Sequence, residues 1–395
     1  MLKRDPISKV TRDMQPSGIR KFFDIVAEMP EAISLGVGEP DFDTPWHIRE
    51  AGIYSLEKGR TFYTSNAGLM ELRREIASYY LRKYGLTYDA KDGVFITVGG
   101  SEAIDMALRA MIDPGDEVII PEPCYVSYVP CAKLAGGVPV TIPLKEENEF
   151  RLTAKELENA ITEKSKVLIL AFPNNPTGAI MEREDLEAVA KVCMEHDLLV
   201  ISDEIYSELT YTGKQHVTIA QIPGMQERTI VINGFSKAYA MTGWRLGYAL
   251  GPNEIITQML KLHQFAIMCA PTTSQYAGVE ALKHGDEDVA RMRESYNQRR
   301  RYLVKTLNDM GLHTFEPFGA FYVFPCIRHL GISSDDFATR LLMEEKLAVV
   351  PGTAFGDCGE GYLRISYAYS MEELKEALGR IKRFVERLEA GIKTV

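Results

Sequence analysis

Paired cysteines are missing from this sequence. Its six cysteines are scattered along 395 residues with no C-x-x-C pair, at Cys124, Cys131, Cys193, Cys269, Cys326 and Cys358. Such spacing fits neither a disulfide framework nor a zinc site. We therefore expect packed thiols and a reducing, cytosolic compartment.

Long apolar runs and an excess of positive charge are missing as well. No apolar stretch approaches the ~20 residues that span a bilayer, and no apolar signal-peptide region follows the polar start MLKRDPISKV. The net charge of −10 argues against nucleic acid or an anionic membrane as a main partner. The arginine run at 299–301 is accordingly predicted to be a solvated helix face. The seven histidines lack metal-ligand spacing such as H-E-x-x-H, so no metal site is predicted.

What the sequence does contain is an alternation of apolar runs with amphipathic helical stretches. The runs are VFITV (94–98), EVIIP (117–121), KVLILAF (166–172), LLVIS (198–202), TIVIN (229–233) and LGYAL (246–250). This pattern predicts an α/β fold whose mostly parallel, mixed sheet is covered on both faces. The charged stretch 286–309 predicts a long helix. We expect an N-terminal segment (1–45) that packs with a small α+β domain (286–395), and a large domain (46–285).

Polar or glycine-rich turns follow four of the predicted strands: GGSEA, PNNPTG, DEIY and GFSK. In an open parallel sheet ligands bind beyond the carboxyl ends of the strands, so these turns predict one crevice. The first turn could bind phosphate at a helix start, or be a tight turn with Ser101 as the helix cap. Asp203 needs a cationic partner if it is sheltered, or else it caps a helix. Residues 174–178 could form no more than a turn.

Two cations stand in the otherwise small or apolar part of NGFSKAYAMTGWRLGY (233–248), where burying an unpaired charge is costly. Lys237 can condense with an aldehyde if its surroundings keep the amine partly deprotonated. Arg245 can bind a phosphate on the same ligand through its two-pronged guanidinium. A ligand with an aldehyde, a phosphate and a ring nitrogen that pairs with Asp203 would be pyridoxal 5′-phosphate (PLP).

The stretch GFSKAYAMTGWRLG resembles the PLP-lysine signature of the class I aminotransferases, which are fold-type I PLP enzymes. Further stretches match in the family's order and spacing: SLGVGEPDFDTP (34–45), YTSNAGLMELR (63–73), TVGGSEA, NNPTG, SDEIY, VVPGTAFG (349–356) and LRISYA (363–368). The resemblance covers nearly the whole chain. It implies a large PLP-binding domain with a smaller α+β domain.

The resemblance implies roles around the cofactor ring. Lys237 would hold PLP covalently and would move a proton once substrate has displaced it. Asp203 would keep the pyridine nitrogen protonated, so that the ring can accept electrons. Asn175 and Tyr206 would bond the phenolic oxygen, and Tyr125 would stack on the ring.

The phosphate of PLP would be bound by the backbone of Ser101 and Glu102, together with Ser236 and Arg245. In the resembled family, the stretch that contains Tyr63 reaches the phosphate of the neighbouring subunit. The resemblance therefore implies a homodimer with shared active sites.

The substrate α-carboxylate would be held by Arg364, with help from Asn175 and the Gly38 backbone. Alternation along the strand places Tyr362 and Ser366 on the same face as Arg364. The competing interpretation of Arg364 is an exposed arginine in a surface ion pair.

The resulting hypothesis is a ping-pong aminotransferase that moves the amino group of an aromatic or other apolar L-amino acid to 2-oxoglutarate. Aspartate-specific members of the family place a lysine where this chain has Ser101. The segment 17–29 supplies an isoleucine and two phenylalanines that could cover an apolar side chain or pack as a helix. Its Arg20 or Lys21 could instead bind a distal carboxylate, which keeps aspartate and N-acetyl-L,L-diaminopimelate open as substrates. A PLP β-lyase acting on sulfur amino acids is the further alternative, and a PLP-sensing regulatory module is disfavoured by the full catalytic set.

Overall fold

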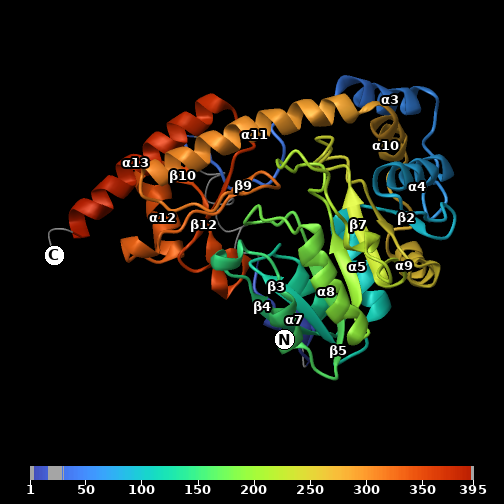
Figure 1. Cartoon of the computed structure of the whole chain (residues 1–395). Coiled ribbons are helices and arrows are strands. Elements are labelled where there is room, and N and C mark those ends of the chain that lie inside the picture. Colours follow the sequence, from blue (N-terminus) through green and yellow to red (C-terminus); the bar gives the residue numbers. More distant parts are fainter. Residues whose placement is uncertain (1–3, 17–28, 30, 393–395) are drawn as a thin grey trace.

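A seven-stranded sheet forms the centre of the larger part of the molecule (Figure 1). The computed structural model describes residues 4–16, 29 and 31–392. The strands follow the spatial order β2-β8-β7-β6-β5-β3-β4. Their bounds are β2 (Val94–Thr97), β3 (Glu117–Glu122), β4 (Val138–Pro143), β5 (Ser165–Ala171), β6 (Leu199–Asp203), β7 (Thr229–Gly234) and β8 (Gly247–Leu250). β8 runs antiparallel to both of its neighbours and the other pairs are parallel, so the predicted mixed α/β sheet is confirmed.

Helices cover both faces of this sheet, which is why its inner strands are mostly apolar. The helices of this part are α3 (Trp46–Glu57), α4 (Met70–Tyr84), α5 (Gly100–Met111), α6 (Tyr128–Leu134), α7 (Ala154–Ala160), α8 (Arg183–Glu195), α9 (Asn253–Ala266) and α10 (Thr272–His284). One core contains Ile201 with residues of α5, α6 and α9, and cores on the other face contain Val200 and Val231. Among the helices of the described residues, none is both long and apolar enough to cross a membrane.

The carboxyl ends of the parallel strands bring the predicted site residues together. In the register of the sheet Asp203, the last residue of β6, lies beside Ala171 of β5 and Ile232 of β7. The turns that follow these three strands therefore leave the sheet at one edge, which is the geometry of a ligand crevice.

The smaller part of the molecule is built on three long helices: α11 (Asp286–Asp309), α12 (Ser334–Glu345) and α13 (Met371–Ile392). They pack around an antiparallel sheet of β11 (Val350–Pro351), β12 (Leu363–Ser366) and β9 (Tyr322–Val323). A parallel pair joins β1 (Ile33–Ser34) to β10 (Leu347–Ala348). The other helical elements of the described residues are short: α1 (Lys9–Asp13) and the 3₁₀ turns η1 (Glu146–Asn148), η2 (Ile219–Gln221), η3 (Gln226–Arg228), η4 (Arg328–Leu330), η5 (Gly352–Phe355) and η6 (Asp357–Gly359).

Helix α11 bridges the two parts, and Figure 1 shows it running from the neighbourhood of α3 and α10 to α13. Val289 packs in a core of the large sheet, whereas Met292 already belongs to the core of the smaller part. Leu35 also packs in that smaller core. We retain the division into 1–45, 46–285 and 286–395 as a proposal that these contacts support.

One prediction about α11 is wrong. Arg299 is 8% and Arg300 4% exposed, so these two arginines do not form a solvated face. Arg299 pairs with Asp41 at 2.7 Å and Arg300 pairs with Glu316, because loops from elsewhere in the chain cover this side of the helix.

Candidate active site

A cavity of about 630 Å³ lies at the carboxyl edge of the large sheet and reaches β12 of the smaller part. Ten of the twelve predicted site residues line it: Gly38, Ser101, Tyr125, Asn175, Asp203, Tyr206, Ser236, Lys237, Arg245 and Arg364. The structure therefore brings together residues that are up to 326 positions apart along the chain (364 − 38).

Lys237 extends from the turn after β7, and its Nζ donates a hydrogen bond to the Gly38 carbonyl at 2.5 Å. Burial and the positive charges of Arg364 and Arg245 lower the pKa of Lys237 to about 8, although Glu39 acts in the opposite direction. At pH 7 about a tenth of such amines are neutral, far more than for an ordinary lysine. A neutral amine is the form that condenses with an aldehyde.

Asp203 is 7% exposed and forms no ion pair with a described residue. Its Oδ2 accepts a hydrogen bond from the Tyr128 hydroxyl at 2.8 Å, and its Oδ1 accepts one from the Ile205 N–H at 3.2 Å. Burial raises its pKa, and these two hydrogen bonds act against that shift. A sheltered carboxylate that can still accept a hydrogen bond from a ligand in the cavity fits a protonated ring nitrogen. Sequence reasoning missed Tyr128, three residues after Tyr125.

The start of α5 and Arg245 form a cradle for an anion. The N-cap of α5 is Gly99, without a side-chain cap, so Ser101 does not cap this helix and the first N–H groups remain available. A Cβ atom on Gly99 would lie 2.7 Å from Arg245 Nη2, which shows how closely the guanidinium approaches this turn. Arg245 donates to the Thr242 carbonyl at 3.0 Å and has no carboxylate partner among the described residues. A free guanidinium beside a helix N-terminus fits a phosphate.

Arg364 is 2% exposed, which rules out the exposed surface arginine that was its alternative interpretation. Its Nη1 donates to Asn175 Oδ1 at 2.9 Å, and its Nη2 donates to the Gly36 carbonyl. Its guanidinium carbon lies 4.5 Å from the ring centre of Tyr322 and 4.8 Å from that of Phe355. Within the described chain no carboxylate pairs with it, and its buried Nε has no partner. Such a group is ready to bind a carboxylate ligand.

Tyr322 of β9, which sequence reasoning also missed, connects the two halves of the site. Its hydroxyl lies 2.8 Å from that of Tyr206, and a Cβ on Gly38 would lie 2.5 Å from the same oxygen. Glycine is therefore needed at position 38 for the backbone to approach. The only signal in the sequence was the apolar run FYVFP, which predicts a strand but not the direction of one hydroxyl.

Three of the predicted features lie elsewhere. The carboxylate of Glu102 bonds the Val98 N–H and His263, so only the Glu102 backbone fits a phosphate role. Tyr63 is 79% exposed and does not line the cavity of its own chain. The candidate substrate residues of segment 17–28 lie outside the described residues.

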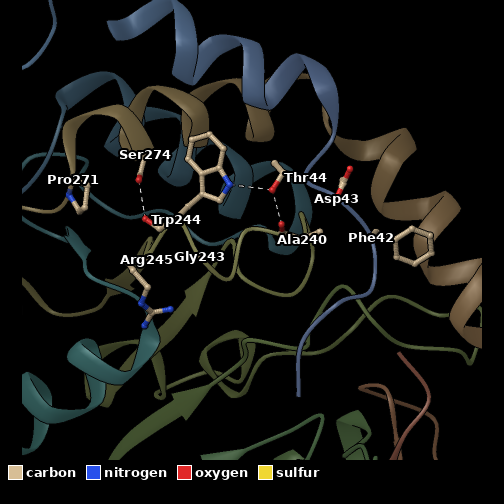
Figure 2. A pocket seen from close by; sticks show the side chains of 9 residues that line it. All are labelled: Phe42, Asp43, Thr44, Ala240, Gly243, Trp244, Arg245, Pro271 and Ser274. Atoms are coloured by element: carbon tan, nitrogen blue, oxygen red, sulfur yellow. Dashed lines mark hydrogen bonds between the residues drawn. The ribbon is translucent and has the colours of Figure 1, made fainter. Parts of the chain in front are cut away.

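Arg245 also lines a second, open pocket of about 520 Å³ (Figure 2). Its wall is fixed by hydrogen bonds: Trp244 Nε1 donates to Thr44 Oγ1 at 3.0 Å, Thr44 Oγ1 donates to the Ala240 carbonyl at 2.6 Å, and Ser274 Oγ donates to the Trp244 carbonyl at 2.7 Å. Arg245 thus lines both the larger cavity and a second hollow that opens to the surface.

Comparison with known proteins agrees with this geometry. The family described as "Aminotransferase class I and II" matches residues 30–381. An aspartate aminotransferase of Pyrococcus abyssi is 48% identical, over 94% of this chain and 96% of the relative. Aromatic-amino-acid aminotransferase 2 of Thermococcus litoralis is 46% identical, over 94% and 96%.

Among solved structures, an aromatic aminotransferase from Pyrococcus horikoshii superposes with a TM-score of 0.89 at 46% identity, covering 93% of this chain and 99% of that one. The lysine, the buried acid and the two arginines that have no carboxylate partner among the described residues also fit the aldehyde, ring nitrogen, phosphate and substrate carboxylate of PLP chemistry. The chain belongs to the class I and II aminotransferases, and it is a PLP-dependent enzyme of fold type I.

Proposed function

We propose that this aminotransferase takes the amino group from an L-amino acid with an aromatic or other apolar side chain and gives it to 2-oxoglutarate in a ping-pong cycle. The observation that carries the proposal is the charge of the cavity. Its cationic lining residues in the described chain are Lys237, Arg245 and Arg364. The cofactor and the α-carboxylate use all three, so a distal carboxylate of the donor finds no further cation among the described lining residues.

The remaining charge in the cavity strengthens this preference. Glu39 lines it and accepts a hydrogen bond from the Thr242 hydroxyl at 3.3 Å. A carboxylate at this position repels an acidic side chain and tolerates an apolar one. The second carboxylate of 2-oxoglutarate would be held by a neutral donor, for which the Ser101 hydroxyl is a candidate.

Each proposed role follows from the position of the side chain. PLP, when bound, supplies an electron sink for the carbanion at the substrate Cα. Lys237 holds the cofactor and then carries the proton from the substrate Cα, which its lowered pKa allows near neutral pH. Asp203 keeps the ring nitrogen protonated, and Tyr128 holds the Asp203 carboxylate in place. Arg364 fixes the α-carboxylate, with Asn175 anchoring its guanidinium.

The donor preference is tested with the PLP-loaded protein and 2-oxoglutarate as acceptor. We expect kcat/KM for phenylalanine and tyrosine to exceed the value for aspartate, with alanine, methionine and N-acetyl-L,L-diaminopimelate measured alongside. The matched variant Ser101→Lys adds the missing cation and should raise kcat/KM for aspartate relative to phenylalanine. A wild-type preference for aspartate over phenylalanine of more than about tenfold, roughly 1.4 kcal/mol, would refute the aromatic assignment.

We also propose that the active unit is a homodimer whose sites are shared. Large apolar side chains lie exposed on one face: Phe62 (80%), Tyr63 (79%), Phe265 (87%) and Met268 (43%). These segments are adjacent, because Asn66 Nδ2 donates to the Met268 carbonyl at 2.8 Å. An exposed apolar face of this kind is typical of a subunit interface. A partner copy that covered it could bring its own Tyr63 to the open pocket beside Arg245.

Shared sites predict complementation between two defective variants. Tyr63→Phe should weaken PLP retention, and a Tyr63 variant that is inactive alone should recover activity when it is mixed with Lys237→Ala. Each hybrid dimer has one intact site, so random exchange in an equal mixture restores up to about a quarter of the wild-type activity. No recovery in confirmed hybrids would show that Tyr63 acts within its own chain.

A further inference from the structure

His263 is completely buried, yet nothing in the proposed chemistry uses it. It lies in the last turn of α9, where its ring meets the edge of Phe95 at a centroid distance of 4.8 Å. Its Nδ1 donates to Glu102 Oε1 at 2.5 Å. Its Nε2 is buried and has no partner among the described residues. Within the described part of the chain, the hydrogen bond to Glu102 is therefore the single polar interaction of this ring.

Glu102 occupies the first turn of α5, the helix whose N-terminus we assign to the cofactor phosphate. Its side chain is 9% exposed. One carboxylate oxygen accepts from His263, and the other accepts from the Val98 N–H at 2.5 Å. The same carboxylate thus ties α9 to the strand end that enters the turn of Gly99 and Gly100.

A carboxylate in this position conflicts with the phosphate. Free N–H groups and the helix dipole attract either anion, so an unrestrained Glu102 would compete for the groups that the phosphate needs. Two anions a few ångströms apart in a partly buried site also repel each other. The two hydrogen bonds turn the Glu102 carboxylate back toward Val98 and α9, which leaves the first N–H groups of α5 facing the cavity.

We propose that His263 is a positioning residue for cofactor binding: it holds the Glu102 carboxylate away from the phosphate cradle and fixes the turn that precedes α5. The inference rests on the proposed phosphate site at Ser101 and Arg245. It concerns only the phosphate, because the hydrogen bond and the ring contact of His263 join it to Glu102 and Phe95, neither of which is among the lining residues of the cavity.

The experiment compares PLP with pyridoxal, which carries the same aldehyde and ring but no phosphate. Each is titrated into apoprotein, and its dissociation constant is read from absorbance. For His263→Phe, which keeps a ring but cannot donate, we expect the PLP dissociation constant to rise at least tenfold and that of pyridoxal to change less than twofold. His263→Asn, which retains a donor near the position of Nδ1, should stay within threefold of wild type for PLP.

Removing the negative charge of Glu102 should restore the PLP binding that His263→Phe loses. The double variant His263→Phe/Glu102→Gln should return to within threefold of the wild-type PLP value. The control is His196→Phe, because His196 also pairs with a glutamate, Glu158 at 2.9 Å, but at the surface and outside the cavity. It should change neither titration. If His263→Phe does not fold, Glu102→Asp takes its place. The aspartate side chain is too short to reach both Val98 and His263, so this variant should weaken the binding of PLP but not that of pyridoxal.

The possible failures are distinguishable. If His263→Phe weakens the binding of PLP and of pyridoxal equally, or if the double variant does not restore PLP binding, His263 has only a structural role. Either result would overturn this inference but not the proposed function. Unchanged PLP binding in His263→Phe, or in Glu102→Asp where that variant takes its place, would do the same. Wild-type protein that binds no PLP at all would overturn the proposed function as well.

Discussion

Replacing Lys237 by alanine is expected to lower kcat for transamination by at least about 10³-fold, within the range that a positioned proton carrier contributes. The side chain is the cavity's single lysine among the described lining residues, and its pKa of about 8 suits both covalent attachment and proton transfer. The variant should also lose the PLP adduct that borohydride reduction traps on the wild-type protein. Steady-state kinetics and mass spectrometry of the reduced protein measure the two effects.

The control for this prediction is Lys283→Ala, which removes a partly exposed lysine that pairs with Glu71 at 2.8 Å. It should keep both the adduct and the activity. If Lys237→Ala still forms a reducible adduct and transaminates like the wild type, the assignment of Lys237 is wrong.

Replacing Arg364 by alanine is expected to reduce kcat/KM for amino acids by about 10²–10³-fold. Removing one partner of a buried, hydrogen-bonded charge pair costs roughly 2–5 kcal/mol, which corresponds to an effect of this order. Arg364→Lys keeps the charge but loses the planar two-pronged geometry, so its activity should lie between those of alanine and arginine. Affinity for PLP should not change, because the role proposed for Arg364 is to bind the substrate.

A substrate without a carboxylate separates this role from general damage to the site. The slow reaction of phenylethylamine should be similar in wild type and Arg364→Ala. Arg328→Ala is the matched control, since Arg328 also lies over an aromatic ring, that of Tyr362 at 4.6 Å, but does not line the cavity. A loss of less than threefold for phenylalanine in Arg364→Ala would contradict the proposed carboxylate contact.

The large sheet could be predicted from the sequence because most of its strands are buried on both faces. Their apolar runs, and the helical stretches between these runs, predict where each strand lies along the chain. The edge strand β4 was missed, since it is partly exposed and contains Pro139 and Pro143, which are tolerated only at an edge. The direction of β8 depends on the connection 235–246, which returns the chain antiparallel beside β7, and an apolar run does not encode this.

The placement of Lys237 and Arg245 in one cavity could be predicted, because both belong to one long motif. Tyr128 and Tyr322 were missed because their function depends on where a hydroxyl points, and tyrosines are frequent in ordinary cores. The burial of Arg299 and Arg300 was missed for a related reason. Their partners Asp41 and Glu316 are brought to α11 by tertiary contacts, so a run of three arginines resembles a solvated surface.

The most direct test of aminotransfer at this site is a half-reaction with the amino donor alone. When phenylalanine, or separately a sulfur amino acid, is added to the PLP-loaded protein without 2-oxoglutarate, we expect at most one oxo acid per active site and no ammonia. Adding 2-oxoglutarate should then restart turnover. Continued release of ammonia and pyruvate from a sulfur amino acid without any acceptor would instead identify a lyase and contradict the proposed function.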